Sequence, residues 1–175
     1  GVIGDEVAEI ERTSAPPEWA EVYEQHALRL VRLATMVAGP ADAHDLVTEA
    51  VLRAVSSEAW PTVAQPGAYL AQTVLHLAED RRRTDSRRRH REQRAQGVGD
   101  VVPLIDVESM VVVRSALEVL TPPQLALVYL HYWEDLTLEH AAEQLGMRVG
   151  TARTHFDRAK RKLRAALANE QGGKR

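Results

Sequence analysis

The chain has 175 residues, and its composition, 45% hydrophobic and only 5% aromatic, is sufficient for a buried core and favours helices over sheets. It contains no cysteine, which excludes disulfides and thiolate zinc sites, and no apolar run approaches the roughly 20 residues of a membrane span. The net charge of -3 hides an asymmetry: basic residues concentrate in 81–94 and 148–175 while residues 1–60 are acidic, which indicates nucleic acid and a basic protein surface as partners.

The first part of the chain is expected to begin with a flexible acidic tail over residues 1–17. From Glu18 apolar residues recur at steps of three and four, which predicts a helix. Gly39 and Pro40 end this helix, because glycine caps it and proline cannot continue it. A second helix is expected over about residues 41–56.

A third helix is expected from about residue 68 into the arginine run that ends at Arg94. Helical periodicity then fades over residues 95–108, which contain glycines and a proline and are the predicted flexible linker. The predicted organisation is a first domain over residues 18–94, a second domain over residues 109–170 and a short tail over residues 171–175.

The second domain opens with helical periodicity near residues 107–120 and a strong helix start after it. Thr121 takes the N-cap position, Pro122 the first helical position, and Gln124 follows the cap by three residues, as in a capping box. No strand-like alternation of useful length is found along the chain. The predicted fold is therefore all-α, with two small helical domains.

The most informative segment, residues 136–164, has the pattern of two short helices around a tight turn. Thr137 can cap the first helix, and Gly146 lies where this helix must end, since glycine adopts positive φ at little steric cost. Gly150 and Thr151 open a second helix that is long and basic. A helix-turn-helix presents its second helix to the major groove, so the segment indicates DNA binding. The alternative is a helical hairpin with a solvated basic face.

Two groups of motifs, in order and at a matching spacing, resemble those of the extracytoplasmic-function (ECF) group of sigma factors. The family helix written roughly A-E-D-L-V-Q-E, with its preceding glycine turn, is tracked by residues 39–55. The family pattern L-x-P-x-Q is tracked by residues 120–124, and its helix-turn-helix pattern by residues 141–160. The resemblance covers about residues 19–94 and 109–167, and it implies a two-domain promoter-recognition subunit of bacterial RNA polymerase.

The resemblance assigns the helix within residues 39–55 to polymerase binding, because the corresponding family helix docks on a coiled coil of the β′ subunit. The expected polymerase-binding residues share one helical face and are Asp42, Asp45, Glu49 and Arg53. A stripe of carboxylates suits a basic partner helix. Without the resemblance, an ordinary solvated face capped by Asp42 would explain the same residues.

The third helix and its arginines resemble the family element that opens and captures the minus-ten promoter region. Base capture needs a pocket for the flipped base and cations along the displaced backbone. The expected contacts are Tyr69, Gln72, His76, Arg81, Arg82 and Arg83. Leu75 and His76 stand where the family usually has Arg-Asn, Gln72 where Arg is common, and an unusual sequence preference is therefore expected. For residues from 87 onward, a solvated basic tail is the alternative.

The basic second helix of residues 136–164 corresponds to the family element that reads the minus-thirty-five region. The expected DNA contacts are Arg148, Thr151, Arg153, Thr154, His155, Asp157, Arg158, Lys160 and Lys162. Arginine can read guanine bidentately and aspartate can accept from a cytosine amine, whereas Lys160 and Lys162 suit phosphate contacts. His155 replaces a usual arginine, and Asp157 either specifies a base or weakens binding.

No arrangement of residues in the sequence indicates catalysis. The histidines are scattered over several predicted helices without an H-x-x-x-H pair, and Gly97-Val98-Gly99 is a lone G-x-G in the predicted linker. We therefore expect no enzymatic activity, no catalytic residue, no metal and no cofactor.

The expected partners are core RNA polymerase, through its β′ and β subunits, promoter DNA, and an anti-sigma factor that the resemblance alone implies. We expect a monomer in the free state, located in the cytoplasm, since neither a membrane span nor a signal peptide is visible. Two alternatives stay open. One is a helix-turn-helix regulator that binds operators without polymerase, and the other is a degenerate sigma-like protein that binds and titrates an anti-sigma factor.

Overall fold

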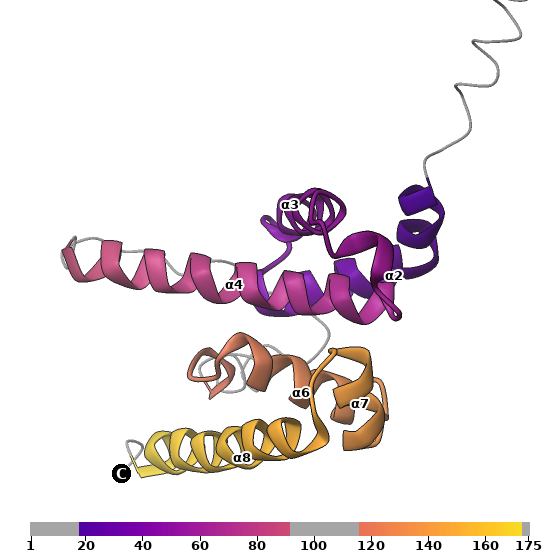
Figure 1. Ribbon diagram of the computed structural model, residues 1–175. Helices are drawn as coiled ribbons and strands as arrows, with labels where there is room; N and C mark the ends of the chain where they lie inside the picture. The colour runs from indigo at the N-terminus through magenta and orange to yellow at the C-terminus, as the bar shows by residue number, and fades with distance from the viewer. Residues whose placement is uncertain (1–17, 92–115, 173–175) are drawn as a thin grey trace, which may run out of the picture.

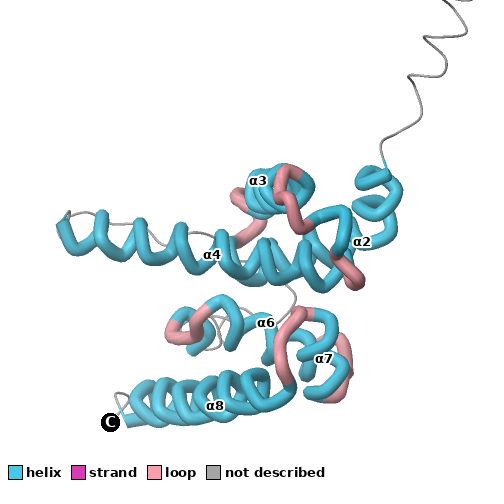
Figure 2. The backbone as a smooth tube through the Cα atoms, viewed as in Figure 1, coloured by secondary structure: helices cyan, strands magenta, loops and turns pink. Residues whose placement is uncertain are grey.

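The computed structural model describes residues 18–91 and 116–172, and within these ranges every regular element is helical (Figure 2). The all-α prediction is therefore confirmed. The predicted linker at residues 95–108 and the acidic tail at residues 1–17 lie outside the described residues. The predicted tail from residue 171 begins inside the last helix, which ends at Gly172.

The first lobe contains three long helices, α2 (Glu18–Ala38), α3 (Ala43–Val55) and α4 (Pro66–Arg91), and one turn of 3-10 helix at Trp60–Thr62. Each long helix packs against the other two. Their shared core is aliphatic, and its fully buried side chains include Leu30, Leu46, Leu70 and Val74. Burying one such side chain contributes about 1.5–3 kcal/mol, so packing rather than helix propensity holds the three helices together.

A glycine ends the first helix as the sequence predicted. Gly39 has φ 86°, and its amide donates to the carbonyl of Thr35 at 2.9 Å. This left-handed residue closes α2 without a side-chain clash and allows the chain to turn sharply into α3. The turn matters for function because it fixes which face of α3 points away from the core.

The second lobe contains α6 (Pro122–Tyr132), α7 (Leu138–Gln144) and α8 (Val149–Gly172), after a short helical segment at residues 116–118. At the start of α6, the amide of Thr121 donates to Oε1 of Gln124 at 3.1 Å, which is the glutamine half of the predicted capping box. Gln124 is buried, 4% exposed.

A helix-turn-helix is formed by α7 and α8. The Thr137 hydroxyl accepts from the amide of His140 at the start of α7, as predicted. At its end, Gly146 has φ 64° and donates to the carbonyl of Glu143, while Met147 donates to that of Ala142. This pair of bonds is a Schellman motif, which requires the left-handed glycine. The small residues at the helix crossing, including Ala141, Ala142, Ala152 and Ala159, are all 0% exposed.

The two lobes pack against each other. Helices α6 and α7 contact α4 on one side and α8 on the other, so they form a layer between the two long helices (Figure 1). Helix α2 also contacts α6. Near this boundary Arg32 lies 4.0 Å from Glu134, and the two side chains are 55% and 37% exposed. An exposed ion pair at this distance contributes little to stability.

Candidate functional site

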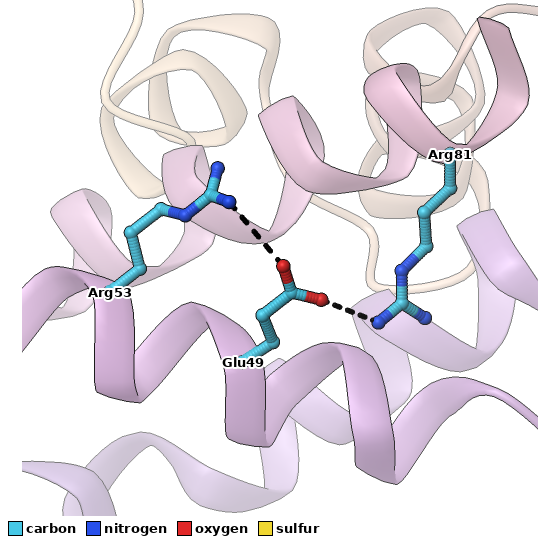
Figure 3. Close-up of polar contacts among 3 residues, drawn as sticks. All are labelled: Glu49, Arg53 and Arg81. Carbon is cyan, nitrogen blue, oxygen red and sulfur yellow. Dashed lines mark hydrogen bonds and ion pairs between the residues drawn. The ribbon is translucent and has the colours of Figure 1, made fainter. Parts of the chain in front are cut away.

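The outer face of α3 and the adjoining face of α4 form a shallow groove around Glu49. The carboxylate of Glu49 receives two arginines: Arg81 of α4 donates to Oε2 at 2.7 Å, and Arg53 of α3 donates to Oε1 at 3.4 Å (Figure 3). Arg81 therefore joins α4 to α3 through a charge-assisted hydrogen bond, which fixes the orientation of the carboxylate.

Three of the four predicted polymerase-binding residues line this groove, Asp45, Glu49 and Arg53. Asp42 is the exposed N-cap residue at the start of α3, and its side chain makes no capping hydrogen bond. Within the described residues Asp45 is exposed and has no polar partner, so it is the carboxylate that this face offers to another molecule.

The groove contains three residues that the sequence did not assign to it: Thr48, Leu52 and Arg81. Leu52 is 57% exposed, so the groove has an apolar surface between its charges. The helical period could have identified Leu52, because it lies off the buried face of α3 marked by Leu46 and Ala50. The two arginines offset the carboxylates, so the groove is of mixed charge rather than acidic.

Helix α4 separates the predicted minus-ten residues into different faces. At about 100° per residue, Tyr69, Gln72, His76 and Arg83 fall within a sector of about 60°. The first two side chains are half-buried and the last two are exposed. Tyr69 also packs on Trp60, with ring centroids 6.1 Å apart, and its hydroxyl donates to Oγ of Ser57 at 3.4 Å. These four residues lie along one side of the helix.

The other two predicted minus-ten residues point elsewhere. Arg81 is directed to Glu49 on α3, as described above. Arg82 crosses the lobe boundary, where its guanidinium donates to the carbonyls of Leu120 and, at 3.3 Å, Glu118. The structure therefore brings four of the six predicted residues together and places Arg81 and Arg82 in contacts with the protein itself.

The outer face of α8 carries most of the predicted minus-thirty-five residues. The exposed ones are Arg148, Thr151, Arg153, Thr154, Asp157 and Arg158. Arg148 directly precedes α8, and the others lie on the sides of the helix away from the buried Ala152, Phe156 and Ala159. Because α6 and α7 lie on the other side of α8 from this face, it is open to solvent even with the lobes packed together (Figure 1).

Short contacts organise the charges of this face. Arg153 lies 3.7 Å from Glu139 of α7, and Asp157 lies 3.0 Å from Lys160 one turn later. The negative charge of Asp157 is thus offset within α8. Of the three predicted arginines on this face, Arg148 and Arg158 have no ion-pair partner among the described residues, so they are more available to an anionic ligand than Arg153.

Two predicted contacts of α8 face inward instead. His155 is half-buried, and its Nδ1 atom is buried with no hydrogen-bond partner among the described residues. Lys162 donates to the carbonyl of Val119 and to Oε1 of Gln124, both at 3.1 Å. Lys162 therefore holds the start of α6 against α8, a contact that sequence reasoning missed because it joins distant segments.

At the end of α6, Tyr129 connects the helix to the following turn. Its hydroxyl donates to Oε1 of Glu134 at 2.6 Å. Burial, with the hydrogen bond and negative charge of Glu134, raises the pKa of Tyr129 to about 12.

In the described part of the chain, no cluster of three or more His, Cys, Asp or Glu could hold a metal ion, and no helix is long and apolar enough to cross a membrane.

Comparison with solved structures places this arrangement among known folds. The structure of the sigma factor RpoE in complex with the anti-sigma factor NepR from Bartonella quintana aligns with a TM-score of 0.51 over 86% of this chain and 97% of that chain. The sequence identity is 20%, so this likeness concerns the fold.

Sequence comparison identifies the family. The chain is 31% identical over 168 residues to the ECF RNA polymerase sigma factor SigE of Mycolicibacterium smegmatis, covering 89% of this chain and 63% of that protein's length. It is 28% identical over 157 residues to the RNA polymerase sigma-E factor of Streptomyces coelicolor, covering 86% and 84%. Residues 22–88 match Sigma-70 region 2 and residues 110–163 match Sigma-70, region 4, so the chain belongs to the sigma-70 family, as a sigma factor of the ECF type.

Proposed function

We propose that this protein acts in the bacterial cytoplasm as a promoter-specificity factor that is monomeric when free. Its first lobe binds core RNA polymerase and opens the minus-ten region, and its second lobe places α8 in the major groove of the minus-thirty-five region. The observation that carries the proposal is that Arg148, just before α8, and Arg158, on α8, are exposed and unpaired within the described residues of a helix-turn-helix. The proposed role is recognition and positioning, with the chemistry left to polymerase.

The proposed polymerase-binding surface is the α3–α4 groove, which would receive a helix of the β′ subunit. Leu52 offers apolar area, and Asp45 offers a carboxylate without a partner inside the described chain. Glu49 is held by Arg53 and Arg81, so it presents a fixed hydrogen-bond acceptor rather than a mobile charge. A partner with an apolar ridge and a basic residue opposite Asp45 fits this surface best.

We also propose an anti-sigma factor as a partner. The support is the fold shared with RpoE, which was solved in complex with the anti-sigma factor NepR. A protein that binds both lobes at once would keep α4 and α8 from separate DNA elements. Contact with the β subunit of polymerase is part of the same proposal, and it rests on the family assignment.

Run-off transcription with bacterial core polymerase on a genomic promoter library tests the function directly. New start sites that share upstream motifs are expected only when the protein is added. If polymerase binds the protein but starts no new transcripts, the result favours the alternative of a degenerate sigma-like protein that titrates an anti-sigma factor. If the protein binds promoter-like DNA but does not bind polymerase, the result favours the alternative of a regulator that binds operators without polymerase.

The substitution Asp45→Arg separates polymerase docking from folding. Asp45 is exposed and unpaired among the described residues, so charge reversal should leave the helical circular dichroism unchanged while abolishing binding to core polymerase in a pull-down. The matched control is Glu24→Arg, which reverses an exposed charge on α2 and should not affect binding. Equal binding by both variants would show that the groove is not the docking surface.

A further inference from the structure

The exposed face of α8 carries one carboxylate near its centre. Within residues 149–169 Asp157 is the only acidic residue, among six lysines and arginines. At about 100° per residue, Asp157 lies about 40° from Arg153 and about 60° from Thr154, on the side of α8 away from its buried residues. A recognition helix in the major groove turns the centre of its exposed face toward base edges and its flanks toward phosphates. In such a complex the carboxylate of Asp157 would meet bases before it meets phosphates.

Lys160 holds one oxygen of this carboxylate. Its Nζ atom lies 3.0 Å from Oδ1 of Asp157 and 5.1 Å from the centroid of the Phe156 ring. Phe156 is 8% exposed, so the core fixes its ring, and the ammonium is held by the ring and the carboxylate together. Lys160 was expected to contact a phosphate, and these two contacts engage it within α8 instead.

The other oxygen of the carboxylate is free for a ligand. Oδ2 of Asp157 has no partner among the described residues, and the side chain is 55% exposed. Because Lys160 restrains Oδ1, Oδ2 keeps a defined direction from the helix. An acceptor that is already oriented loses less conformational entropy when it binds, which favours a specific hydrogen bond.

A carboxylate distinguishes bases because it accepts hydrogen bonds and donates none. In the major groove guanine presents two acceptors, and thymine presents one acceptor beside a methyl group, so both disfavour it. Adenine presents an amino donor next to the acceptor N7, which would repel the carboxylate. Cytosine presents its N4 amino group without a neighbouring acceptor. The chemistry of Asp157 therefore fits cytosine best.

The alternative is that Asp157 only weakens binding to DNA. A free carboxylate beside DNA repels phosphates and lowers the affinity for every sequence. Here the ammonium of Lys160 offsets the charge of Asp157. Arg161 is exposed one turn further along the same side of α8, and it attracts the phosphates that a carboxylate repels. The loss of general affinity is thus reduced, while the selective acceptor Oδ2 remains.

We propose that Asp157 is a specificity-determining residue, which accepts a hydrogen bond from the N4 amino group of a cytosine in the minus-thirty-five element. Lys160 is the positioning residue for its carboxylate. Asp157 follows Arg153 by four residues, about 6 Å along the helix axis at 1.5 Å per residue, so the cytosine lies within about two base pairs of the bases next to Arg153. The inference rests on the proposed function of α8 and adds to it the base and the atom that reads it.

Selection of DNA from a library of duplexes with a randomised segment tests the inference. The full-length protein, alone and with bacterial core polymerase, is used as wild type, Asp157→Asn and Asp157→Ala, and the bound DNA is sequenced. The wild type should prefer cytosine at one position by at least about fivefold, the lower end of discrimination by a base contact. Asp157→Asn should change that preference to adenine, because asparagine bonds both N6 and N7. Asp157→Ala should remove it and leave the other positions unchanged.

The matched control for the lost charge is Glu143→Asn, at an exposed carboxylate of α7, which should leave every base preference as in the wild type. Lys160→Met should weaken the preference for cytosine, and Lys160→Arg should restore it, a result that a purely structural role of Lys160 would not give. Circular dichroism should be the same for all these variants.

Three outcomes would contradict the inference at different levels. If Asp157→Ala binds all duplexes more tightly and keeps every base preference, the carboxylate only weakens binding and its reading of cytosine is refuted. If only Lys160→Met keeps the preference for cytosine, the positioning role of Lys160 is refuted and that of Asp157 stands. If the wild type selects no common sequence with or without polymerase, the proposed function of α8 is refuted, and the inference with it.

Discussion

Helices α4 and α8 are the two long basic helices of the molecule, and they differ in what their cations contact. On α4, Arg81 bonds Glu49 and Arg82 bonds carbonyls of the other lobe. On α8, Arg158 is exposed and unpaired among the described residues. Arg81 and Arg82 on α4 therefore differ from Arg158 on α8 in their availability to DNA, and the difference comes from neighbouring elements rather than from the helices themselves.

The largest expected effect on stability comes from truncating a side chain in the core of the first lobe. Leu46→Ala should lower the free energy of unfolding by about 2–5 kcal/mol, because Leu46 is fully buried between α3 and its neighbours. Leu52→Ala on the same helix, at a residue 57% exposed, should change stability by less than about 0.5 kcal/mol. Urea denaturation gives both values. A large loss for Leu52→Ala would mean that the groove belongs to the core.

The next largest effect is on DNA binding, where substitutions on α8 and α4 should differ. Arg158→Ala and Arg153→Ala should each weaken binding to a minus-thirty-five duplex by ~1–3 kcal/mol if they read bases. Arg81→Ala should change binding by the free protein little, because Arg81 is held by Glu49. Fluorescence anisotropy at fixed salt measures both. A greater loss for Arg81→Ala than for Arg158→Ala would reverse the comparison between α4 and α8.

Within α8, Lys162 is expected to behave as a structural residue. Lys162→Met should lower stability by about 1–2 kcal/mol, because it removes hydrogen bonds from an ammonium to Val119 and to the buried Gln124. Arg164→Met, at an exposed position two residues later, is the control and should be nearly neutral. Thermal unfolding distinguishes the two. Similar melting temperatures would place Lys162 with the solvated cations.

The smallest effects are expected in how stability depends on pH. The first lobe should lose stability at acid pH and the second lobe at alkaline pH. Burial and, secondarily, Arg29 lower the pKa of His26, so the folded first lobe binds a proton less readily than the unfolded chain. The contribution of neutral His26 to stability is complete above about pH 6.5 and falls as the pH drops below that value.

In the second lobe the pKa shift has the opposite direction, so stability is lost as the pH rises. Tyr129 has its pKa raised to about 12, so its contribution is complete below about pH 10 and is lost between pH 10 and 12. His26→Gln should flatten only the acid side of a stability profile and Tyr129→Phe only the alkaline side. Both shifts concern partly exposed groups, so the changes should be small. Loss of both sides in one variant would contradict this assignment.

Much of the fold could be predicted because its signals are local. Gly39 and Gly146 were expected to end helices, and both have positive φ; Thr137 was expected to cap a helix, and it does. Such features depend on the few residues around a turn. Boundaries shifted by up to two residues, as for the second helix, expected from residue 41 and observed from Ala43.

The candidate sites were less predictable because their contacts join distant segments. The ion pair of Arg81 with Glu49 could have been suspected from the helical period, which places Arg81 on a different side of α4 from Tyr69 and His76. The contacts of Arg82 and Lys162 with the turn at residues 118–120 could not, because they depend on how separate elements pack. The half-buried position of His155 likewise depends on the elements around α8.

The missing side chain of Gly146 has a consequence for any substitution at this position. This one position both bends the helix-turn-helix and lets the neighbouring lobe come near, so a substitution there acts on two properties at once. Asparagine tolerates positive φ better than other side chains, and Gly146→Asn would preserve the bend while adding atoms toward Ala68. Because a Cβ at this position would already lie 3.2 Å from the carbonyl oxygen of Ala68, we expect Gly146→Asn to weaken the packing between the lobes while the turn itself is kept.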